Sequence, residues 1–195
     1  AGMEGASRFL KRLWTLAQAH LAPAVLDKAA LTAEQKNLRR KLHETIRKIS
    51  DDYSRRHSYN TAVAACMELL NAVQKFEDHT PNGCAVSREA VEAMILLLAP
   101  ITPHLCHGLW LALGHRTPVH QARWPLVDAA ALVSDTVKLV VQVNGKLRST
   151  IEAPASASND EVLALALADE NVKRFISGAV KKKIVVPGKL VNLVV

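Results

Sequence analysis

The stretch "VQVNGKLR", from Val141 to Arg148, decides the fold of the second half of the chain. From Val137 into this stretch, apolar side chains recur at every second position (Val137, Leu139, Val141, Val143), which is the period of a strand with one buried face. Asn144-Gly145 then tolerates the positive φ angles of a two-residue type I′ turn. We therefore predict a β-hairpin whose return strand buries Leu147 and directs Lys146 and Arg148 to the opposite face.

The residues after this hairpin complete a small α+β module. "SNDE" (158–161) has the spacing of a capping box and opens a helix. A further helical turn or two holds Val172 and Phe175, which is expected to be a core residue, and Gly178 closes it. "KIVVPGKLVNLVV" (183–195) then predicts two strands around Pro187-Gly188. The order is β-β-α-β-β, and we assign this C-terminal domain to residues 136–195.

The residues before the hairpin have helical periodicity. Helices are predicted over about 4–22, from a capping box at Thr32 and Gln35, from about 60, from about 87, and from Pro103 with Thr102 as its cap to Gly114. Short connections between amphipathic helices predict an antiparallel bundle over residues 1–128. A stretch with two prolines and no clean period ends the bundle, and residues 129–135 are expected to link it to the module.

Composition sets broad limits on the class of protein. The 195 residues are 49% hydrophobic and carry a net charge of +7, which favours an acidic partner such as nucleic acid or a membrane surface. No run reaches the roughly 18 to 20 apolar residues that span a bilayer. Three widely spaced cysteines without a CxxC pair fit a reducing cytoplasm. The start "AGMEGASRFLKRLW" has no signal-peptide core and no initiator Met, so we expect a piece of a longer protein.

Motifs for bond chemistry are absent from the sequence. It contains no GxGxxG, no GxxxxGK[ST] loop, no HExxH and no GxSxG. His104 and His107 stand three residues apart on one predicted helix, but no carboxylate or cysteine partner stands nearby, so packing is favoured over a metal site. His115 and His120 have no evident partner. We expect neither catalytic nor metal-binding residues in this chain.

Basic residues cluster on the second predicted helix and after it. They are Arg39, Arg40, Arg47, Lys48, Arg55 and Arg56, with Lys41 among them, and all stand off the apolar stripe. One interpretation is a surface that tracks phosphates. The other is a solvated face of mixed charge, since Glu44, Asp51 and Asp52 are interleaved.

The small module is richer in cations for its size. Its candidate RNA-binding residues are Asn144, Lys146, Arg148, Lys173, Arg174, Lys181, Lys182, Lys183 and Lys189. Platforms that stack bases need exposed aromatic side chains, and Phe175 is the module's one aromatic residue, so recognition through backbone and shape is expected. The alternative for Lys181 to Lys183 is an edge strand that uses lysines against aggregation.

Four stretches together resemble a known family. "GMEGASRFLKRLW" (2–14), "ITPHLCHGLW" (101–110), "VQVNGKLR" and "VPGKLVNLVV" (186–195) are similar, in order and spacing, to the C-terminal part of bacterial-type leucyl-tRNA synthetases. "TPHLCHGLW" alone is weaker, since valyl- and isoleucyl-tRNA synthetases carry similar stretches. The resemblance covers the whole chain.

The resemblance implies a function and partners. The full enzyme would attach leucine to tRNA(Leu) with ATP and magnesium, and its catalytic core and editing domain would lie upstream. This chain would comprise the helical-bundle anticodon-binding domain and the C-terminal domain, which in the family reaches the outer corner of the tRNA. Lys146 and Arg148 would then face phosphate or the bases of that corner. A monomer that contacts the upstream domains of its own chain, outside any membrane, is expected.

Two other classes of function stay open. One is a standalone RNA-binding or chaperone module, and the other is a scaffold whose bundle docks a protein partner. A scaffold predicts an exposed apolar patch, whereas RNA binding predicts a continuous basic face.

Overall fold

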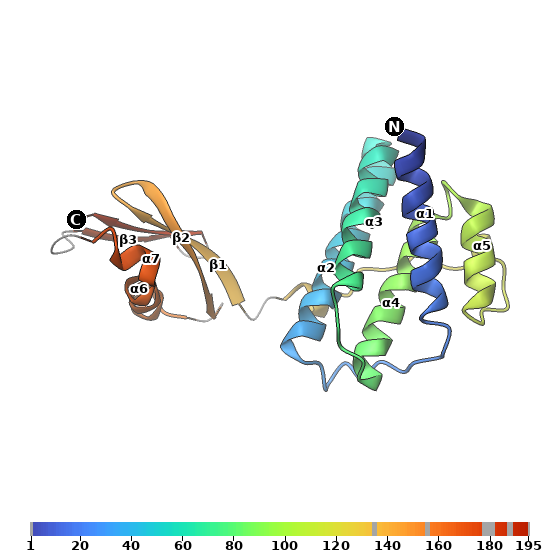
Figure 1. Cartoon of the computed structure of the whole chain (residues 1–195), viewed down its shortest axis with the longest axis horizontal. Helices are drawn as coiled ribbons and strands as arrows, with labels where there is room; N and C mark the ends of the chain where they lie inside the picture. The colour runs from blue at the N-terminus through green and yellow to red at the C-terminus, as the bar shows by residue number, and fades with distance from the viewer. Residues whose placement is uncertain (1, 134–135, 155–156, 177–181, 187–188, 195) are drawn as a thin grey trace. The chain divides into compact units, whose positions relative to one another are not determined.

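The computed structural model describes residues 2–133, 136–154, 157–176, 182–186 and 189–194. The chain forms two compact units, Ala1–Val133 and Ser134–Val195. Each is described by itself. The first is made of helices, and the second holds a four-stranded mixed sheet with two short helices (Figure 1).

Over residues 2–133, which the structure describes, the first unit is built of five α-helices. They are α1 (Gly2–Gln18), α2 (Ala33–Asp51), α3 (Tyr59–Gln74), α4 (Pro81–Leu98) and α5 (Pro103–Ala112). A π-helical turn, η1 (Asp52–Arg56), extends α2, and two 3-10 turns follow α5, η2 (Val119–Gln121) and η3 (Ala129–Leu132). The periodic apolar positions of the sequence form the core; Leu13, Leu42, Leu70 and Met94 are all fully buried. Burial of such stripes is the main source of helix stability.

Local signals in the sequence explain most helix ends. The Thr32–Gln35 capping box is present, with Gln35 N donating to Thr32 Oγ1 at 3.3 Å and Thr32 N donating to Gln35 Oε1 at 3.1 Å. Gly114 has a φ of 90°, the left-handed conformation expected after α5. Thr102 precedes α5 but makes no side-chain cap, because its hydroxyl donates back to Leu98 O.

Two predicted helices have different bounds in the structure. α1 ends at Gln18 rather than near residue 22. α4 begins at Pro81, six residues before the predicted start, because Thr80 caps it by accepting a hydrogen bond from Gly83 N at 3.1 Å. Thr80-Pro81 is a cap followed by proline at the first helical position, which is a signal that the sequence does contain.

The predicted linker is largely part of the first unit. Residues 129–132 form η3, which packs on α2. Asp128 begins this turn by accepting a hydrogen bond from Ala130 N at 3.1 Å, and its own N–H donates to His43 Nδ1 at 3.1 Å. Residues 134–135 lie outside the described residues.

The second unit has the element order expected from its sequence. It consists of β1 (Thr136–Val143), β2 (Lys146–Pro154), α6 (Asn159–Ala168), α7 (Glu170–Lys173), β3 (Lys182–Val186) and β4 (Leu190–Val194). The sheet order is β2-β1-β4-β3, with β1 and β4 parallel and the other neighbours antiparallel. α6 and α7 pack on the sheet. The core between helices and sheet includes Val141, Val143, Val172 and Leu193.

The hairpin contains an irregularity that the sequence did not reveal. Asn144 and Gly145 have φ angles of 51° and 76°, as a type I′ turn requires. Val141 pairs with Ser149, but the next residue, Gln142, pairs with Leu147, so Arg148 is an extra residue on β2. This arrangement is a β-bulge, which redirects the side chains beyond it.

The bulge overturns the predicted orientation of β2. Directly paired residues lie on the same side of a sheet, so Lys146, opposite buried Val143, stands on the helix-covered side. Leu147 pairs with Gln142 on the other side and is 63% exposed. The prediction that Leu147 is buried and that Lys146 and Arg148 point away from the core face was therefore wrong.

Candidate nucleic-acid interface

The predicted cations of the first unit are mostly neutralised within the protein. Lys48 Nζ lies 2.8 Å from Asp52 Oδ2, and both Arg55 and Arg56 pair with Asp51. These hydrogen bonds and charges lower the pKa of Asp52 and of Asp51. Arg40 donates to Asn37 Oδ1 at 2.9 Å. Contacts with phosphate would have to compete with these partners, so the interpretation as a mixed-charge face fits this set best.

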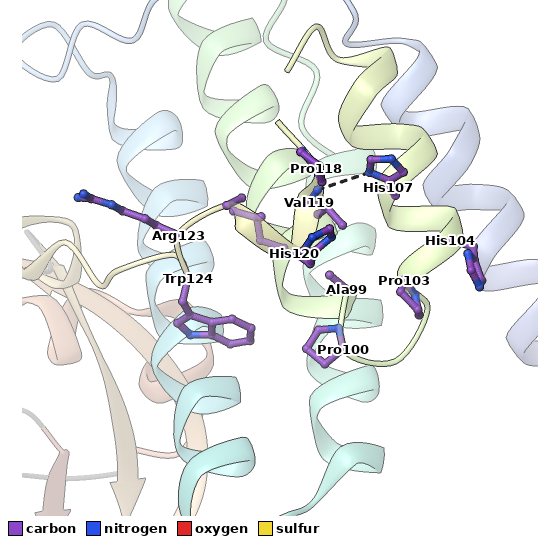
Figure 2. A pocket seen from close by; sticks show the side chains of 12 residues that line it. Ala99, Pro100, Pro103, His104, His107, Pro118, Val119, His120, Arg123 and Trp124 are labelled. Atoms are coloured by element: carbon purple, nitrogen blue, oxygen red, sulfur yellow. Dashed lines mark hydrogen bonds between the residues drawn. The ribbon is translucent and has the colours of Figure 1, made fainter. Parts of the chain in front are cut away.

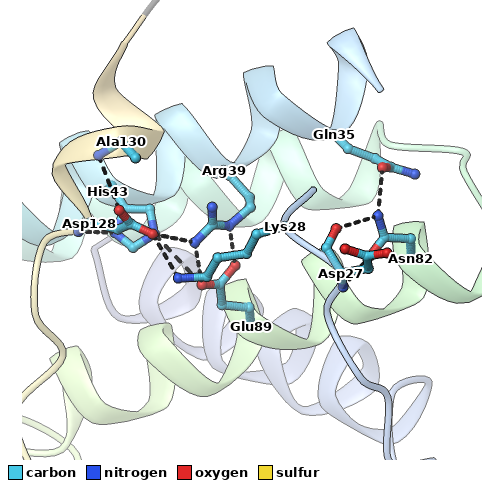
Figure 3. A network of polar contacts seen from close by, with 9 residues as sticks. All are labelled: Asp27, Lys28, Gln35, Arg39, His43, Asn82, Glu89, Asp128 and Ala130. Carbon is cyan, nitrogen blue, oxygen red and sulfur yellow. Dashed lines mark hydrogen bonds and ion pairs between the residues drawn. The ribbon is translucent and has the colours of Figure 1, made fainter. Parts of the chain in front are cut away.

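Arg39 is not a surface residue. Its side chain is 4% exposed and lies between α2 and α4, where Nε and Nη2 donate to the two carboxylate oxygens of Glu89 at 2.7 and 2.9 Å (Figure 3). Nη2 also lies 3.2 Å from Asp128 Oδ2, to which Lys28 Nζ donates at 2.8 Å. The expectation that Arg39 faces solvent and tracks phosphate was wrong, because long-range partners bury it.

This network also holds the ring of His43 in place. The ring is buried, and its Nδ1 accepts the backbone N–H of Asp128, which leaves the proton of a neutral ring on Nε2. Nε2 lies 3.7 Å from Glu89 Oε1. Burial raises the pKa of Glu89, but hydrogen bonds from His43 and Arg39 outweigh it and lower the pKa to about 2. The network therefore fastens the segment before η3 to α2 and α4.

The candidate cations of the second unit lack such partners within the part of the chain that the structure describes. Among its described residues, no carboxylate forms a salt bridge with Lys146, Arg148, Lys173, Arg174, Lys182, Lys183 or Lys189. All of them except Arg148 are exposed. Asn144 is exposed at the tip of the hairpin, and Lys181 lies outside the described residues. When exposed cations without ion-pair partners bind phosphates, counterions leave the nucleic acid, and no ion pair within the protein has to break.

The sheet divides these cations into two groups. Lys146 and Arg148 stand on the edge strand β2, next to α7, which carries Lys173 and precedes Arg174. Lys182 and Lys183 stand on β3, which is the opposite edge of the sheet. The β2–α7 group combines strand and helix cations, whereas the β3 group also fits lysines that protect an edge strand.

Phe175 is a residue whose place the sequence interpretation misjudged. It is 44% exposed, and the guanidinium carbon of Arg148 lies 3.8 Å from the centre of its ring. Phe175 was expected in the core, but that core is filled by Val162, Ala166 and Val172. The sequence signal was only the absence of further aromatic residues, which cannot distinguish a core ring from an exposed one.

Three histidines of the first unit line an apolar cavity. Twelve residues line a pocket of about 560 Å³ between the α4–α5 turn and residues 118–124, among them His104, His107 and His120 (Figure 2). His107 Nδ1 accepts a hydrogen bond from Val119 N at 3.4 Å, and Trp124 is held by its indole N–H, which donates to Ser50 Oγ at 2.8 Å. No carboxylate, thiol or hydroxyl lines the pocket.

Within the described ranges, no three His, Cys, Asp or Glu residues stand close enough to hold a metal ion. His115, for which the sequence suggested no partner, lies 3.1 Å from Glu92 Oε1 and stacks on Trp110. Of the helices that the structure describes, none combines the length and the apolar character needed to cross a membrane.

Comparisons with known proteins relate this chain to tRNA ligases. A family model described as "Anticodon-binding domain of tRNA ligase" matches residues 35–164. The leucine–tRNA ligase of Chromohalobacter salexigens is 59% identical over 198 residues, and that of Saccharophagus degradans is 55% identical over 199 residues. Each match covers 100% of this chain, which spans 23% and 24% of the length of these two relatives.

A solved structure shows the same similarity. It is described as the ternary complex of Agrobacterium radiobacter K84 agnB2 LeuRS with tRNA and LeuAMS, and it covers 97% of this chain with a TM-score of 0.79 at 27% identity. The match takes up 25% of that protein's chain. With a family model over two thirds of its residues and relatives that align along all of it, the chain belongs to the family of the anticodon-binding domain of tRNA ligases.

Proposed function

We propose that this chain is the tRNA-binding part of a leucine–tRNA ligase, and that it positions tRNA(Leu) while the chemistry takes place elsewhere in the longer protein. The family and the names of the relatives support leucine as the amino acid. The observation that carries the binding role is the set of exposed cations in the second unit without carboxylate partners among the described residues. Such cations favour a polyanion over a neutral partner.

The β2–α7 group is our candidate for the main RNA contact. It comprises Lys146, Arg148, Lys173 and Arg174, with Asn144 at the adjoining hairpin tip. Lys182, Lys183 and Lys189 are assigned a secondary role along the other edge. In the first unit, Arg47 is an exposed cation without a salt bridge among the described residues, so it is the bundle residue that we retain as a phosphate contact.

The proposal extends to the rest of the protein. The antiparallel bundle and the β-β-α-β-β domain that follows it would be attached to catalytic and editing domains outside this chain. This arrangement would account for the share of its relatives' length that the chain spans. ATP and magnesium are assigned to those other parts. A monomer in the cytoplasm is the form in which we expect the whole enzyme to act.

A binding titration across a salt series tests the proposal. The chain is titrated against tRNA(Leu) and a non-cognate tRNA, and we expect tighter binding of tRNA(Leu) and a steep fall of affinity with salt. A steep salt dependence without a preference for tRNA(Leu) would mean that the chain binds tRNA non-specifically. No binding at low salt would contradict the proposal and favour a protein-docking role instead.

A further inference from the structure

The second unit presents a cation stacked on an aromatic ring that is open to solvent. The guanidinium carbon of Arg148 lies 3.8 Å from the centre of the Phe175 ring, and Phe175 is 44% exposed. Arg148 Nε is out of contact with solvent and has no hydrogen-bond partner among the described residues. The guanidinium is therefore held by stacking rather than by hydrogen bonds or an ion pair.

Neighbouring contacts fasten the two elements that carry this pair. Ser149 Oγ donates to Asp169 Oδ2 at 2.9 Å, which ties β2 to the start of α7. Asp169 Oδ1 accepts the N–H of Val172 at 3.0 Å, and Phe175 N donates to Val172 O at 3.0 Å. Val172 is fully buried. The bulge at Arg148 and the short helix thus set the guanidinium and the ring in place before any ligand arrives.

The surroundings of the pair are positive. Lys146 lies two residues away on β2, and Lys173 and Arg174 immediately precede Phe175. Two acids, Asp169 and Glu170, stand at the start of α7, and the oxygens of Asp169 already accept the hydrogen bonds from Val172 and Ser149, which lower its pKa. A ligand with both a flat ring and negative charge matches this combination.

We propose that Arg148 and Phe175 form a stacking platform for one unpaired nucleobase of a bound RNA, with Lys146, Lys173 and Arg174 taking the adjacent phosphates. The inference rests on the proposed function and adds the mode of recognition. A base stacks on an aromatic side chain or on the plane of an arginine guanidinium, and a guanidinium already stacked on a ring loses little freedom on binding. Any base can stack in this way, so the platform adds affinity rather than sequence specificity.

Two pairs of variants separate stacking from charge. Arg148→Lys keeps the charge and removes the plane, whereas Lys146→Gln removes a charge and leaves the stack. Phe175→Leu keeps apolar volume and removes the ring, whereas Phe175→Tyr keeps a ring. Each is titrated as the whole chain against tRNA(Leu) over a salt series, after its melting curve shows that it is folded.

The platform predicts a distinct result for each variant. Arg148→Lys and Phe175→Leu should weaken binding by roughly 5- to 100-fold with an unchanged salt slope, from typical values for base stacking. Phe175→Tyr should keep most of the affinity that Phe175→Leu loses, and Lys146→Gln should lower the salt slope by about one. Equal affinities of the Leu and Tyr variants would overturn the platform, as would full affinity of Arg148→Lys. Failure of the unaltered chain to bind tRNA would instead refute the proposed function.

Discussion

Arg39 and Glu89 form a two-point ion pair between α2 and α4, with Nε 2.7 Å from Oε2 and Nη2 2.9 Å from Oε1. Arg39 is buried and Glu89 is partly buried, so the pair is shielded from most solvent screening. Lys28 and Asp128 extend it to two connecting segments. The pair therefore joins two helices and the segment that leads out of the bundle.

Removal of Arg39 alone should destabilise the first unit strongly. Arg39→Ala leaves Glu89 and Asp128 without their main partner, and breaking a buried pair typically costs about 3–5 kcal/mol. Arg39→Met combined with Glu89→Leu should cost less, because no uncompensated charge remains. Urea unfolding followed by circular dichroism measures both, and equal costs for the single and double variants would contradict the buried-pair interpretation.

Acid should weaken the same network. The pKa of Glu89 falls from 4.5 to about 2 in the folded protein, so the unfolded chain binds the proton more readily between these values. The stabilisation that the ionised Glu89 contributes is fully present above about pH 4.5 and is lost as the pH falls toward 2. The difference between the two pKa values corresponds to about 3 kcal/mol of free energy of unfolding. Hydrogen bonds from Lys28 and Arg39 also lower the pKa of Asp128, which adds loss in the same direction.

Urea midpoints between pH 7 and pH 3 measure this loss. Glu89→Gln should be less stable than the unaltered chain at pH 7 and should show a shallower decline on acidification. Glu34→Gln, at an exposed position of α2, serves as the control and should keep the full decline. An unchanged decline in Glu89→Gln would mean that other carboxylates govern acid unfolding.

Local patterns predicted the elements of this fold well. The Thr32–Gln35 and Ser158–Glu161 capping boxes, the Asn144-Gly145 turn and the apolar stripes depend on residues a few positions apart, and the structure contains all of them. Contacts between distant residues could not be predicted in this way. Arg88, for example, is buried and donates to the carbonyls of four residues that follow α1 or α5, namely His20, Leu21, Ala22 and Leu113.

The candidate site shows the same division. Its cations could be found from composition, but the bulge that turns Arg148 toward Phe175 depends on the pairing register of β1 and β2. One extra residue reverses the side on which following residues stand. Likewise, nothing near Arg39 in the sequence indicated that Glu89, fifty residues later, would bury it. The roles of the candidate cations in RNA binding stay predictions.

The tight turn gives a local prediction. Gly145 has a φ of 76°, so Gly145→Val should strain the backbone and lower the stability of the second unit by about 1 kcal/mol or more. No atom beyond its chain neighbours lies within 4 Å of an added Cβ, so the cost arises from conformation and not from a clash. Thermal unfolding tests this, with Gly5→Val on an exposed helical surface as a sterically open control.

The two sets of cations should differ in their effect on RNA binding. Lys146, Lys182 and Lys183 are exposed without carboxylate partners among the described residues, whereas Lys48, Arg55 and Arg56 are paired with Asp51 or Asp52. Replacing either set with glutamine changes the net charge by the same amount. A general effect of charge would therefore be equal in the two triple variants, and a difference between them reports on position.

We expect the first triple variant to lower the salt slope of tRNA(Leu) binding by up to about 3, since each lost phosphate contact removes about 0.9. The second should leave the slope nearly unchanged and should instead lower the melting temperature of the first unit, because loss of Lys48 leaves the buried carboxylate of Asp52 without its cation, whereas the exposed pairs of Arg55 and Arg56 are worth little. Equal slopes for both variants would show that the RNA responds to the overall charge of the chain. A larger loss in the second variant would move the interface to the end of α2 and η1.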